Sequence, residues 1–393
     1  MKLVCFLDQI KIATSIGHYR RVQEDLSRFI EEEINMLIFV FVLFALLVPT
    51  VSGNRWLLEN LDIDWEQETM AKKVMSENFH DWRNEHKKEY RNSTEEMYRK
   101  SVWETNFELV HKHNRNNMSY RLILNHFADM TAAEFETRYL LPRNVSAPQK
   151  CSATTTSKPF LKSDVEKLPK YFNWKDRGVV SKVKFQGFCG SCWAFSTTGA
   201  LEAHTTIQTK KRLLYSEQQL VDCAQDFNNH GCKGGLPAQA YQYAQYNDLE
   251  TEDEYPYWGM FGGKCKYNNQ SKKAVRVLES INITQKDELQ IQAAVANSGP
   301  VSVAYDVALD FRFYFDGVYD STWCKSGQEN VNHAVLVVGY GNDKKSGKDY
   351  WFIKNSWGTL FGMRGYFKMR RGVNMCGVAD CASYPSKIKV IFR

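Results

Sequence analysis

The stretch "QGFCGSCW" at residues 186–193 restricts the fold and the chemistry of this chain more than any other feature. Two cysteines separated by Gly-Ser fit a redox pair, half of a metal site, or one disulfide cysteine beside one reactive thiol. Ten cysteines in 393 residues are many for a protein that stays in a reducing compartment. They occupy positions 5, 151, 189, 192, 223, 232, 265, 324, 376 and 381. This number predicts disulfides and passage through an oxidising compartment.

A hydrophobic segment agrees with that route. "MLIFVFVLFALLVPTVSG" begins at Met36, is apolar as far as Val48 and ends in small residues near Gly53. The run is short for a membrane span, so it predicts a signal peptide cleaved near Gly53 and no stable membrane insertion afterwards. Residues 1–35 contain "EEE", a poor start for a signal peptide, and we therefore expect Met36 to be the working start. A signal anchor on the longer form is the alternative.

Composition narrows the class of protein. Apolar residues make up 43% and charged residues 24%, as in ordinary soluble domains. The net charge of +6 comes with no Lys/Arg-dense block, so a nucleic-acid partner is not expected. Five N-x-S/T triplets are candidate glycosylation sites in a secretory protein: Asn92, Asn117, Asn144, Asn269 and Asn282.

The chain divides by pattern into a helical leader, a linker and a main domain. The stretch "EEMYRKSVWETNFELVHKHN" places Trp103, Phe107 and Val110 at steps of three and four, which predicts an amphipathic helix. The Ser/Thr/Pro-rich "NVSAPQKCSATTTSKP" is typical of an exposed, cleavable linker. The main domain begins near Leu168.

The main domain has two halves. Ser191 can cap a helix that starts at Cys192, and "AQAYQYAQY" has a second helical pattern. In the later half, "PVSVAYDV", "HAVLVVGYG", "DYWFIKNSW" and "GYFKMRR" alternate like strands of an antiparallel sheet or barrel. A helical lobe followed by a β lobe leaves a cleft that suits an extended substrate.

The stretch Cys-Gly-Ser-Cys-Trp resembles the local signature of papain-like cysteine proteases. That family has a His and an Asn roughly 130 to 150 residues downstream. "NHAVLVVGYG" supplies His333 and "KNSWG" supplies Asn355, slightly beyond that window. Gln186 stands six residues before Cys192, where the family places its oxyanion donor.

The resemblance implies a role for each of these residues. Cys192 is the nucleophile, because a helix N-terminus and an imidazolium partner favour its thiolate. Asn355 orients His333, and Gln186 stabilises the oxyanion together with the Cys192 N–H. Two further features follow from the family: Trp357 shields the His–Asn hydrogen bond, and Gly234 and Gly235 let a substrate backbone approach closely. No cofactor or metal is expected.

Other interpretations of Cys192 are weaker. A buried structural thiol leaves four motifs in the family's order unexplained. A thioredoxin-like redox pair lacks the βαβ setting and gives His333 and Asn355 no role. A zinc site needs a second pair of ligands, and the sequence shows none.

The cysteine pairing follows the resemblance. The family pattern pairs Cys189–Cys232, Cys223–Cys265 and Cys324–Cys376. Two cysteines of the exported chain remain, and a fourth bridge, Cys151–Cys381, would remove a free exposed thiol. "APQKCSAT" at 147–154 and "CGVADCASYP" then resemble the cathepsin H branch, in which an octapeptide mini-chain stays attached by a disulfide. Cut after Thr154, its carboxylate would bind a substrate α-ammonium and favour aminopeptidase cleavage.

The leader is also similar to the family's inhibitory propeptide. The helix motif is carried by Glu95, Arg99, Trp103, Asn106, Val110 and Asn114, and a second motif by Asn125, Phe127 and Asp129. This segment is expected to occupy the cleft of an inactive zymogen, although a helix that only assists folding fits the same pattern.

Phe361 stands where relatives carry Trp and is expected to alter the packing behind Trp357.

Together these observations predict an α+β, papain-like two-lobe fold: a helical lobe and an antiparallel β-barrel lobe with a cleft between them, preceded by a helical prodomain. The expected boundaries are 1–53 for the extension and signal peptide, 54–146 for the propeptide, 147–154 for the mini-chain, 155–167 for a linker and 168–393 for the peptidase. We expect a monomeric lysosomal aminopeptidase with some endopeptidase activity, acting on peptides and proteins and inhibited by its own propeptide and by cystatins. Secretion, a general endopeptidase and a catalytically silent binding or redox protein are the alternatives.

Overall fold

The computed structural model describes residues 78–116, 118–141, 151 and 165–393. The signal-peptide segment, most of the mini-chain with Thr154, and the sequons at Asn117 and Asn144 lie outside these residues. No helix within the described ranges is long and apolar enough to cross a membrane.

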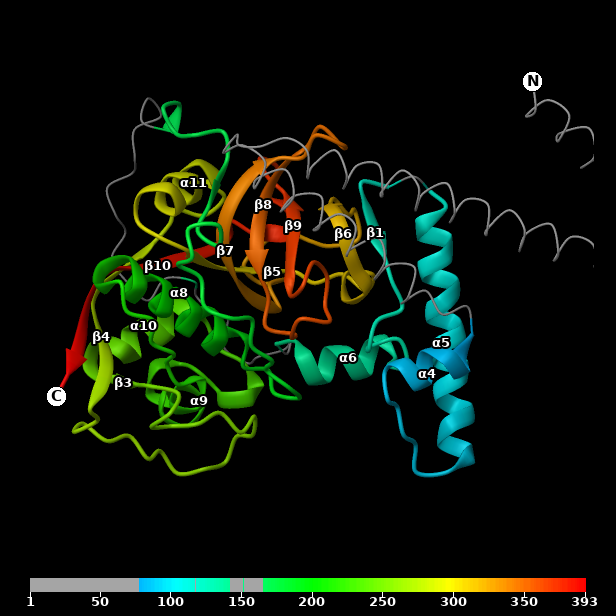
Figure 1. Cartoon of the computed structure of the whole chain (residues 1–393), viewed down its shortest axis with the longest axis horizontal. Coiled ribbons are helices and arrows are strands. Elements are labelled where there is room, and N and C mark those ends of the chain that lie inside the picture. The colour runs from blue at the N-terminus through cyan, green and yellow to red at the C-terminus, as the bar shows by residue number, and fades with distance from the viewer. Residues whose placement is uncertain (1–77, 117, 142–150, 152–164) are drawn as a thin grey trace, which may run out of the picture. The chain divides into compact units, whose positions relative to one another are not determined.

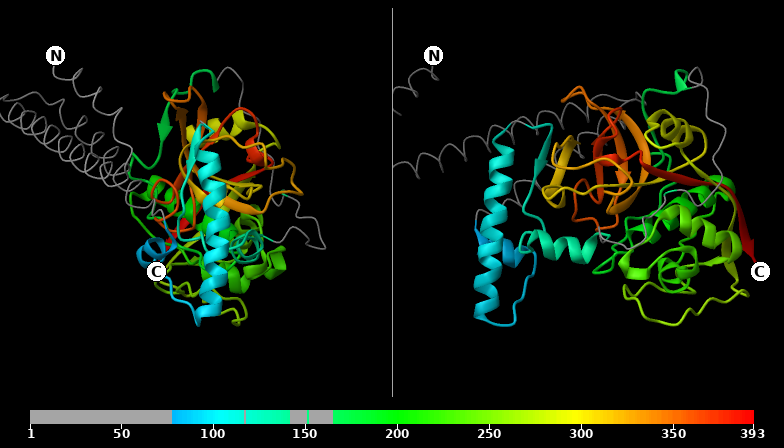
Figure 2. Two further views of the ribbon diagram at one scale, coloured as in Figure 1. Left: turned by 90° about the vertical axis from the view of Figure 1, so that its right-hand side faces the viewer. Right: turned by 180° about the vertical axis from the view of Figure 1, so that it is seen from behind.

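The N-terminal part is built on one long helix. Its elements are α4 (Phe79–Glu85), α5 (Ser93–Asn114), β1 (Tyr120–Leu122) and α6 (Ala132–Tyr139). Asn92 begins α5 by accepting a hydrogen bond from the Glu95 N–H, and Thr131 begins α6 with a capping box to Glu134. Trp103 and Val110 are buried on the predicted apolar face of α5, which lies along β1 (Figures 1 and 2).

The helical half of the main domain surrounds α8, which is buried along most of its length. Its elements are β2 (Phe172–Asn173), α8 (Cys192–Thr209), α9 (Glu217–Cys223), η1 (Gln225–Phe227), η2 (Gly231–Lys233), α10 (Pro237–Tyr246) and β3 (Leu249–Glu250). Helix α8 packs against α9 and α10 on one side and against the sheet strand β7 on another. The first residue of α8 therefore lies where the helical half meets the sheet.

The second half is dominated by strands, as the alternating pattern predicts. Its elements are β4 (Lys273–Asn282), α11 (Glu288–Asn297), β5 (Val301–Tyr305), η3 (Phe311–Phe313), β6 (Tyr314–Tyr319), β7 (His333–Asn342), β8 (Asp349–Lys354), β9 (Tyr366–Arg370), η4 (Met375–Gly377) and β10 (Cys381–Phe392). The strands pair in the order β1-β6-β9-β8-β7-β5-β10-β4-β3, with β2 added beside β7. Pairing is antiparallel except between β6 and β9, which run parallel. The edge strand β1 comes from the leader, so leader and main domain share one sheet.

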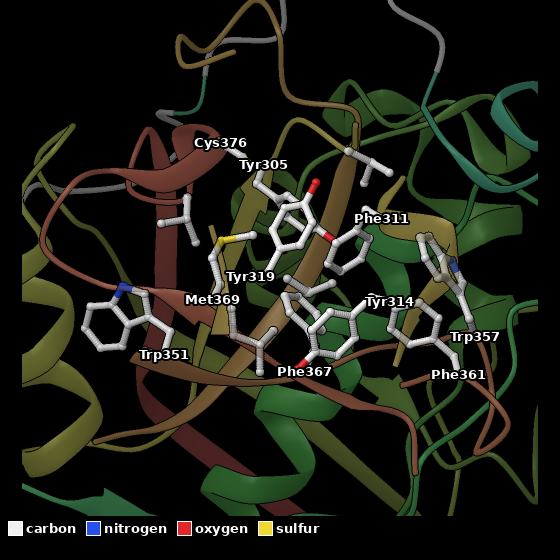
Figure 3. Packing of buried hydrophobic residues seen from close by; sticks show 14 of the residues in the cluster. Tyr305, Phe311, Tyr314, Tyr319, Trp351, Trp357, Phe361, Phe367, Met369 and Cys376 are labelled. Carbon is white, nitrogen blue, oxygen red and sulfur yellow. The ribbon is translucent and has the colours of Figure 1, made fainter. Parts of the chain in front are cut away.

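The core of this half is mainly aromatic. Figure 3 shows Phe311, Phe361, Phe367 and Trp357 among the packed rings of this buried cluster. Phe361, which replaces the expected Trp, meets Trp357 edge to face with ring centroids 4.9 Å apart. The smaller ring thus still supports Trp357.

The sequons that the structure describes differ in exposure. Asn92 and Asn269 are exposed, at the start of α5 and in a turn respectively. Asn282 is the least accessible candidate, because it ends β4 opposite Ser383 of β10 and only 6% of it is exposed. This burial argues against a glycan at that position.

Candidate active site

Cys192 is the first residue of α8 and is completely buried. It is the one free cysteine among the described residues. Its Sγ accepts a hydrogen bond from the Ala334 N–H at 3.4 Å, which joins the helix to strand β7. The motif at 189–192 therefore holds one disulfide cysteine and one thiol at a helix N-terminus.

His333 begins β7, next to Ala334, and is also completely buried. Its Nε2 lies 2.8 Å from Asn355 Oδ1. An amide oxygen only accepts hydrogen bonds, so the proton sits on Nε2 and Nδ1 is left as the base. His333 Nδ1 has no hydrogen-bond partner among the described residues. This is the free nitrogen that a base for a neighbouring thiol requires.

Trp357 covers the His–Asn hydrogen bond. Its ring stacks on the His333 ring at a centroid distance of 4.5 Å and an interplanar angle of 27°. Asn355 Oδ1 also accepts the Ser356 N–H at 2.8 Å, which fixes the amide orientation. The pair is thus oriented and kept from water, as the resemblance implies.

Burial opposes a charge on each of the two reactive groups. It raises the pKa of the Cys192 thiol to about 12, although hydrogen bonds from backbone N–H groups oppose the shift. Burial likewise lowers the pKa of His333 to about 4. Each shift disfavours a charge on one group taken alone, and the thiolate–imidazolium pair expected from the sequence stays a prediction.

The leader enters the site through a backbone carbonyl. Gln186 Nε2 donates to the Tyr139 carbonyl at 3.1 Å and to the Cys189 carbonyl at 2.8 Å. Gln186 Oε1 accepts the Ser356 hydroxyl at 2.7 Å, and this turns the amide so that Nε2 faces the leader. A carbonyl oxygen of the leader thus lies where a substrate oxyanion would bind.

The next leader residues continue along the cleft. The Leu141 N–H donates to the Asn332 carbonyl at 2.7 Å, one residue before His333. Tyr139, Phe127 and Phe135 surround the outer side of Trp357 with edge-to-face contacts at 6.5, 5.9 and 5.1 Å. The leader therefore fills the site with main-chain polar groups and covers it with aromatic rings.

Ser191 does not cap α8 in the way the sequence suggests. It holds the N-cap position, but its side chain makes no capping hydrogen bond. Its hydroxyl lies 2.7 Å from the Tyr257 hydroxyl instead. The helix N-terminus at Cys192 is thus stabilised through its surroundings.

The structure contains the four expected disulfides. They are Cys151–Cys381, Cys189–Cys232, Cys223–Cys265 and Cys324–Cys376. Cys151 and Cys381 are 230 residues apart in sequence, with Cα atoms 5.1 Å apart. This bridge attaches the end of the leader to strand β10.

The two glycines proposed for substrate contact have clear backbone reasons. Gly234 has φ +113° and ψ 176°, which a side chain would strain. Gly235 packs against the Trp193 ring and the Asn229 side chain, so a Cβ would not fit there. Their contact with a substrate stays a prediction.

Three functional contacts were not predicted from sequence. Tyr139 acts through its carbonyl, for which no sequence pattern exists. Ser356 and Tyr257 act through hydroxyls on Gln186, and only the position of Ser356 next to Asn355 could have suggested a role. Among the described residues, no group of three His, Cys, Asp or Glu side chains is arranged to hold a metal ion.

Residues 168–386 match the papain family cysteine protease domain, and residues 79–135 match the cathepsin propeptide inhibitor domain (I29). Cysteine proteinase 2 of Zea mays is 50% identical over 299 residues, covering 76% of this chain and 81% of the relative. Pro-cathepsin H of Bos taurus is 45% identical over 342 residues, covering 86% and 98%.

Solved structures of precursors agree with these matches. The digestive procathepsin L2 proteinase of Tenebrio molitor superposes with a TM-score of 0.70 at 36% identity, covering 79% of this chain and 98% of that one. The recombinant stem bromelain precursor superposes with a TM-score of 0.68 at 32% identity, covering 78% and 97%. The two-lobe fold with a preceding propeptide is thereby confirmed.

Proposed function

This chain belongs to the papain family of cysteine proteases and is the zymogen form with its I29 propeptide, and from that premise we propose that the mature enzyme acts mainly as an aminopeptidase. Some endopeptidase activity is expected to remain. The observation that carries the proposal is the Cys151–Cys381 disulfide, which keeps a piece of the leader attached to the peptidase domain.

The position of Cys381 can be followed from strand to strand. Cys381 of β10 pairs with Ala304 of β5, and Ala304 pairs with Ala334 of β7. Ala334 donates its N–H to Cys192 Sγ. Two strand spacings of about 4.8 Å each put Cys381 roughly 10 Å from the residue that contacts the nucleophile.

A short peptide can span that distance. Thr154 follows Cys151 by three residues, and an extended chain covers about 3.3–3.6 Å per residue, so its end reaches roughly 10 Å. After cleavage at Thr154, the new carboxylate would meet the α-ammonium of a substrate. A hydrogen bond between charged groups is worth about 1.5–3 kcal/mol, or roughly 10- to 100-fold preference for a free amino terminus.

In the proposed reaction, His333 Nδ1 takes the proton of the Cys192 thiol, and Sγ attacks the carbonyl carbon of the scissile bond. The electron pair of the carbonyl moves to its oxygen, which the Gln186 amide and the Cys192 N–H stabilise. Collapse breaks the C–N bond, and the imidazolium gives its proton to the leaving amine. Water, deprotonated by His333, then hydrolyses the thioester and frees Cys192.

The remaining parts of the proposal follow from the leader and the disulfides. Four bridges in one chain favour maturation in an oxidising compartment, and the likeness to pro-cathepsin H supports delivery to the lysosome. The substrates are peptides and proteins. Cystatin-type inhibitors and a monomeric state complete the proposal.

The test compares free and blocked substrates. The paired variant Cys151→Ser/Cys381→Ser removes the tether and leaves no odd thiol. It is expected to lose roughly 10- to 100-fold in kcat/KM on an aminoacyl amide with a free α-amine and to gain on the N-terminally acylated form. Cys223→Ser/Cys265→Ser is the matched control for loss of a disulfide, and its ratio of the two activities should not change.

Two results would redirect the proposal. An unchanged ratio in the tether variant would favour the general endopeptidase. A wild-type chain whose Cys192 does not react with an epoxide-type thiol inhibitor after propeptide release would favour the silent binding protein.

A further inference from the structure

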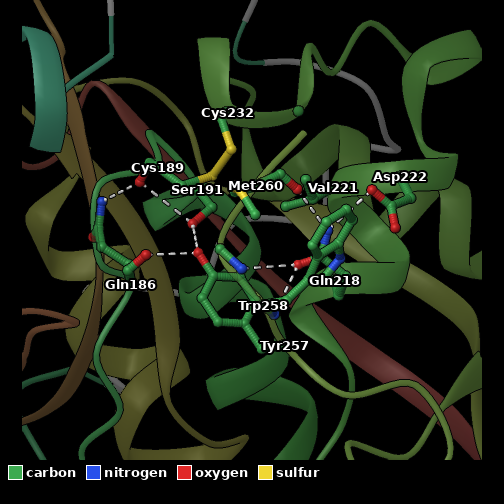
Figure 4. The surroundings of a disulfide bond; sticks show 12 residues. Gln186, Cys189, Ser191, Gln218, Val221, Asp222, Cys232, Tyr257, Trp258 and Met260 are labelled. Atoms are coloured by element: carbon green, nitrogen blue, oxygen red, sulfur yellow. Dashed lines mark hydrogen bonds between the residues drawn. A yellow bond between two sulfur atoms is a disulfide. The ribbon is translucent and has the colours of Figure 1, made fainter. Parts of the chain in front are cut away.

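Tyr257 lies in the loop between β3 and β4 and contacts two residues of the oxyanion site. They are Gln186, which supplies one donor, and Ser191, which precedes the other. The Tyr257 hydroxyl donates to the Gln186 carbonyl at 2.7 Å and lies 2.7 Å from the Ser191 hydroxyl. A phenol has one proton to give, so Ser191 is the donor in the second bond, in place of its longer hydrogen bond to the Cys189 carbonyl at 3.4 Å. Figure 4 shows the Tyr257 hydroxyl between these two residues.

The two partners carry the two halves of the oxyanion site. Gln186 supplies the side-chain amide, and Ser191 immediately precedes Cys192, whose N–H is the second donor. Both partners are fully buried. The Tyr257 hydroxyl therefore bridges two backbone segments whose separation sets the distance between the two donors.

The loop that carries Tyr257 is itself held rigidly. Gln218, fully buried in α9, accepts the N–H groups of Trp258 and Gly259, each at 3.2 Å, and donates to the Met260 carbonyl at 2.8 Å. The Tyr257 ring meets the Phe195 ring edge to face at 4.9 Å, one helical turn beyond Cys192. The hydroxyl thus approaches from a fixed support.

We infer that Tyr257 is a positioning residue of the oxyanion site, which holds the Gln186 segment and the start of α8 at the spacing that the tetrahedral intermediate requires. This inference rests on the role proposed for Gln186 and Cys192. It also gives the Ser191 hydroxyl a use other than helix capping. A misplacement of about 1 Å in such a site can cost roughly 100-fold in rate.

The chain offers a matched control two residues away. Tyr255 lies on the same loop and donates its hydroxyl to Asp222 Oδ2 at 2.9 Å, with no contact to Gln186 or Ser191. Tyr257→Phe and Tyr255→Phe each remove one hydroxyl from the loop. Only the first removes the bridge.

The experiment uses the processed enzyme with an aminoacyl amide substrate. We expect Tyr257→Phe to lower kcat by about 10-fold or more with a KM changed less than about twofold, since the bridge acts on the intermediate. The inhibition constant of a peptide aldehyde, which forms a hemithioacetal with Cys192, should rise by the same factor. The rate of Cys192 alkylation by an epoxide should stay as in the wild type, because the thiol itself is untouched.

The possible outcomes distinguish failure of the positioning role of Tyr257 from failure of the proposed Cys192 peptidase chemistry. Equal kcat values in Tyr257→Phe and Tyr255→Phe, or a parallel fall of aldehyde binding and alkylation, would overturn the positioning role. If Tyr257→Phe does not fold, Ser191→Ala serves instead, and it must show the same split between aldehyde binding and alkylation. A wild-type enzyme that resists alkylation would remove the peptidase chemistry and this role with it.

Discussion

His126 of the propeptide should make the zymogen sensitive to acid. It precedes Phe127, one of the rings over Trp357, and its Nδ1 is buried without a hydrogen-bond partner in the described part of the chain. Burial lowers the pKa of His126 to about 3, and the charges of Lys88 and His86 act in the same direction. The Lys88 ammonium is held nearby by the His126 carbonyl and by Asp129, each at 2.8 Å.

The sign of the effect follows from the direction of the shift. If release exposes this histidine to water, it binds a proton near pH 6.5, whereas in the docked propeptide it does not until about pH 3. The docked form therefore has its full stability above about pH 6.5 and loses it as the pH falls. At pH 4.5, about two units below the pKa of a histidine in water, the docked form has lost about 2.7 kcal/mol of stability. This corresponds to roughly 100-fold in the docking equilibrium.

The perturbation is His126→Gln, which keeps a neutral polar side chain but cannot take up a proton in this range. Its control is His80→Gln, because His80 is exposed on α4. Amide hydrogen exchange of α6 in the Cys192→Ala zymogen would report propeptide opening between pH 7 and 4.5. Relative to wild type, His126→Gln should become more protected by roughly 100-fold at pH 4.5 and by little at pH 7. A wild-type opening profile in His126→Gln, or the same change in His80→Gln, would refute the reasoning.

Three further expectations follow from single contacts. Asn355→Ala should lower kcat/KM of the processed enzyme by about 100-fold with a smaller change in KM, because His333 loses the acceptor that orients it. Asn106→Ala should lower the unfolding free energy of the zymogen by about 1–3 kcal/mol in denaturant titration, because Asn106 bonds two propeptide carbonyls and accepts from the buried Arg312 at 2.9 Å. Asn269→Gln should remove one glycan from protein made in a secretory host, as measured by intact mass, and an unchanged mass would exclude that sequon.

The residues of the reactive pair could be predicted from sequence because each sits in a short motif with a definite local structure. Cys192 starts a helix, His333 starts a strand, and Asn355 follows one, so motif and element agree. Their ionisation could not be predicted in the same way. The pKa shifts of Cys192 and His333 come first from burial, which depends on how segments far apart in the chain pack around them.

Contacts made by backbone groups and hydroxyls could not be predicted from the sequence, for a different reason. No sequence pattern marks the Tyr139 carbonyl, the Asn332 carbonyl or the Tyr257 hydroxyl, because any loop of similar composition contains the same groups. Their roles arise from packing between segments far apart in the chain, as with Gln186 and Tyr257, which are 71 positions apart. The burial of the sequon at Asn282 could not be predicted for the same reason, because it results from the pairing of β4 with β10.

The fold shows a similar division. Alternating residues predicted the strands β5, β7, β8 and β9, because each has one face or both faces in the core. The parallel pairing of β6 with β9, and the addition of β1 to the sheet edge, depend on which strands meet after long connections. Periodicity describes one strand at a time and does not specify its neighbour.

Inhibition by the propeptide thus has two parts that act at the same site. The Tyr139 carbonyl takes the Gln186 donor, which blocks a substrate carbonyl from that place. Burial of the same site disfavours a charge on Cys192 and on His333, because a charge without water is costly. We expect release of the propeptide to return water to the site and so to make the thiolate–imidazolium pair more favourable. Proton uptake by His126 would drive release, and proton transfer from Cys192 to His333 would follow from it.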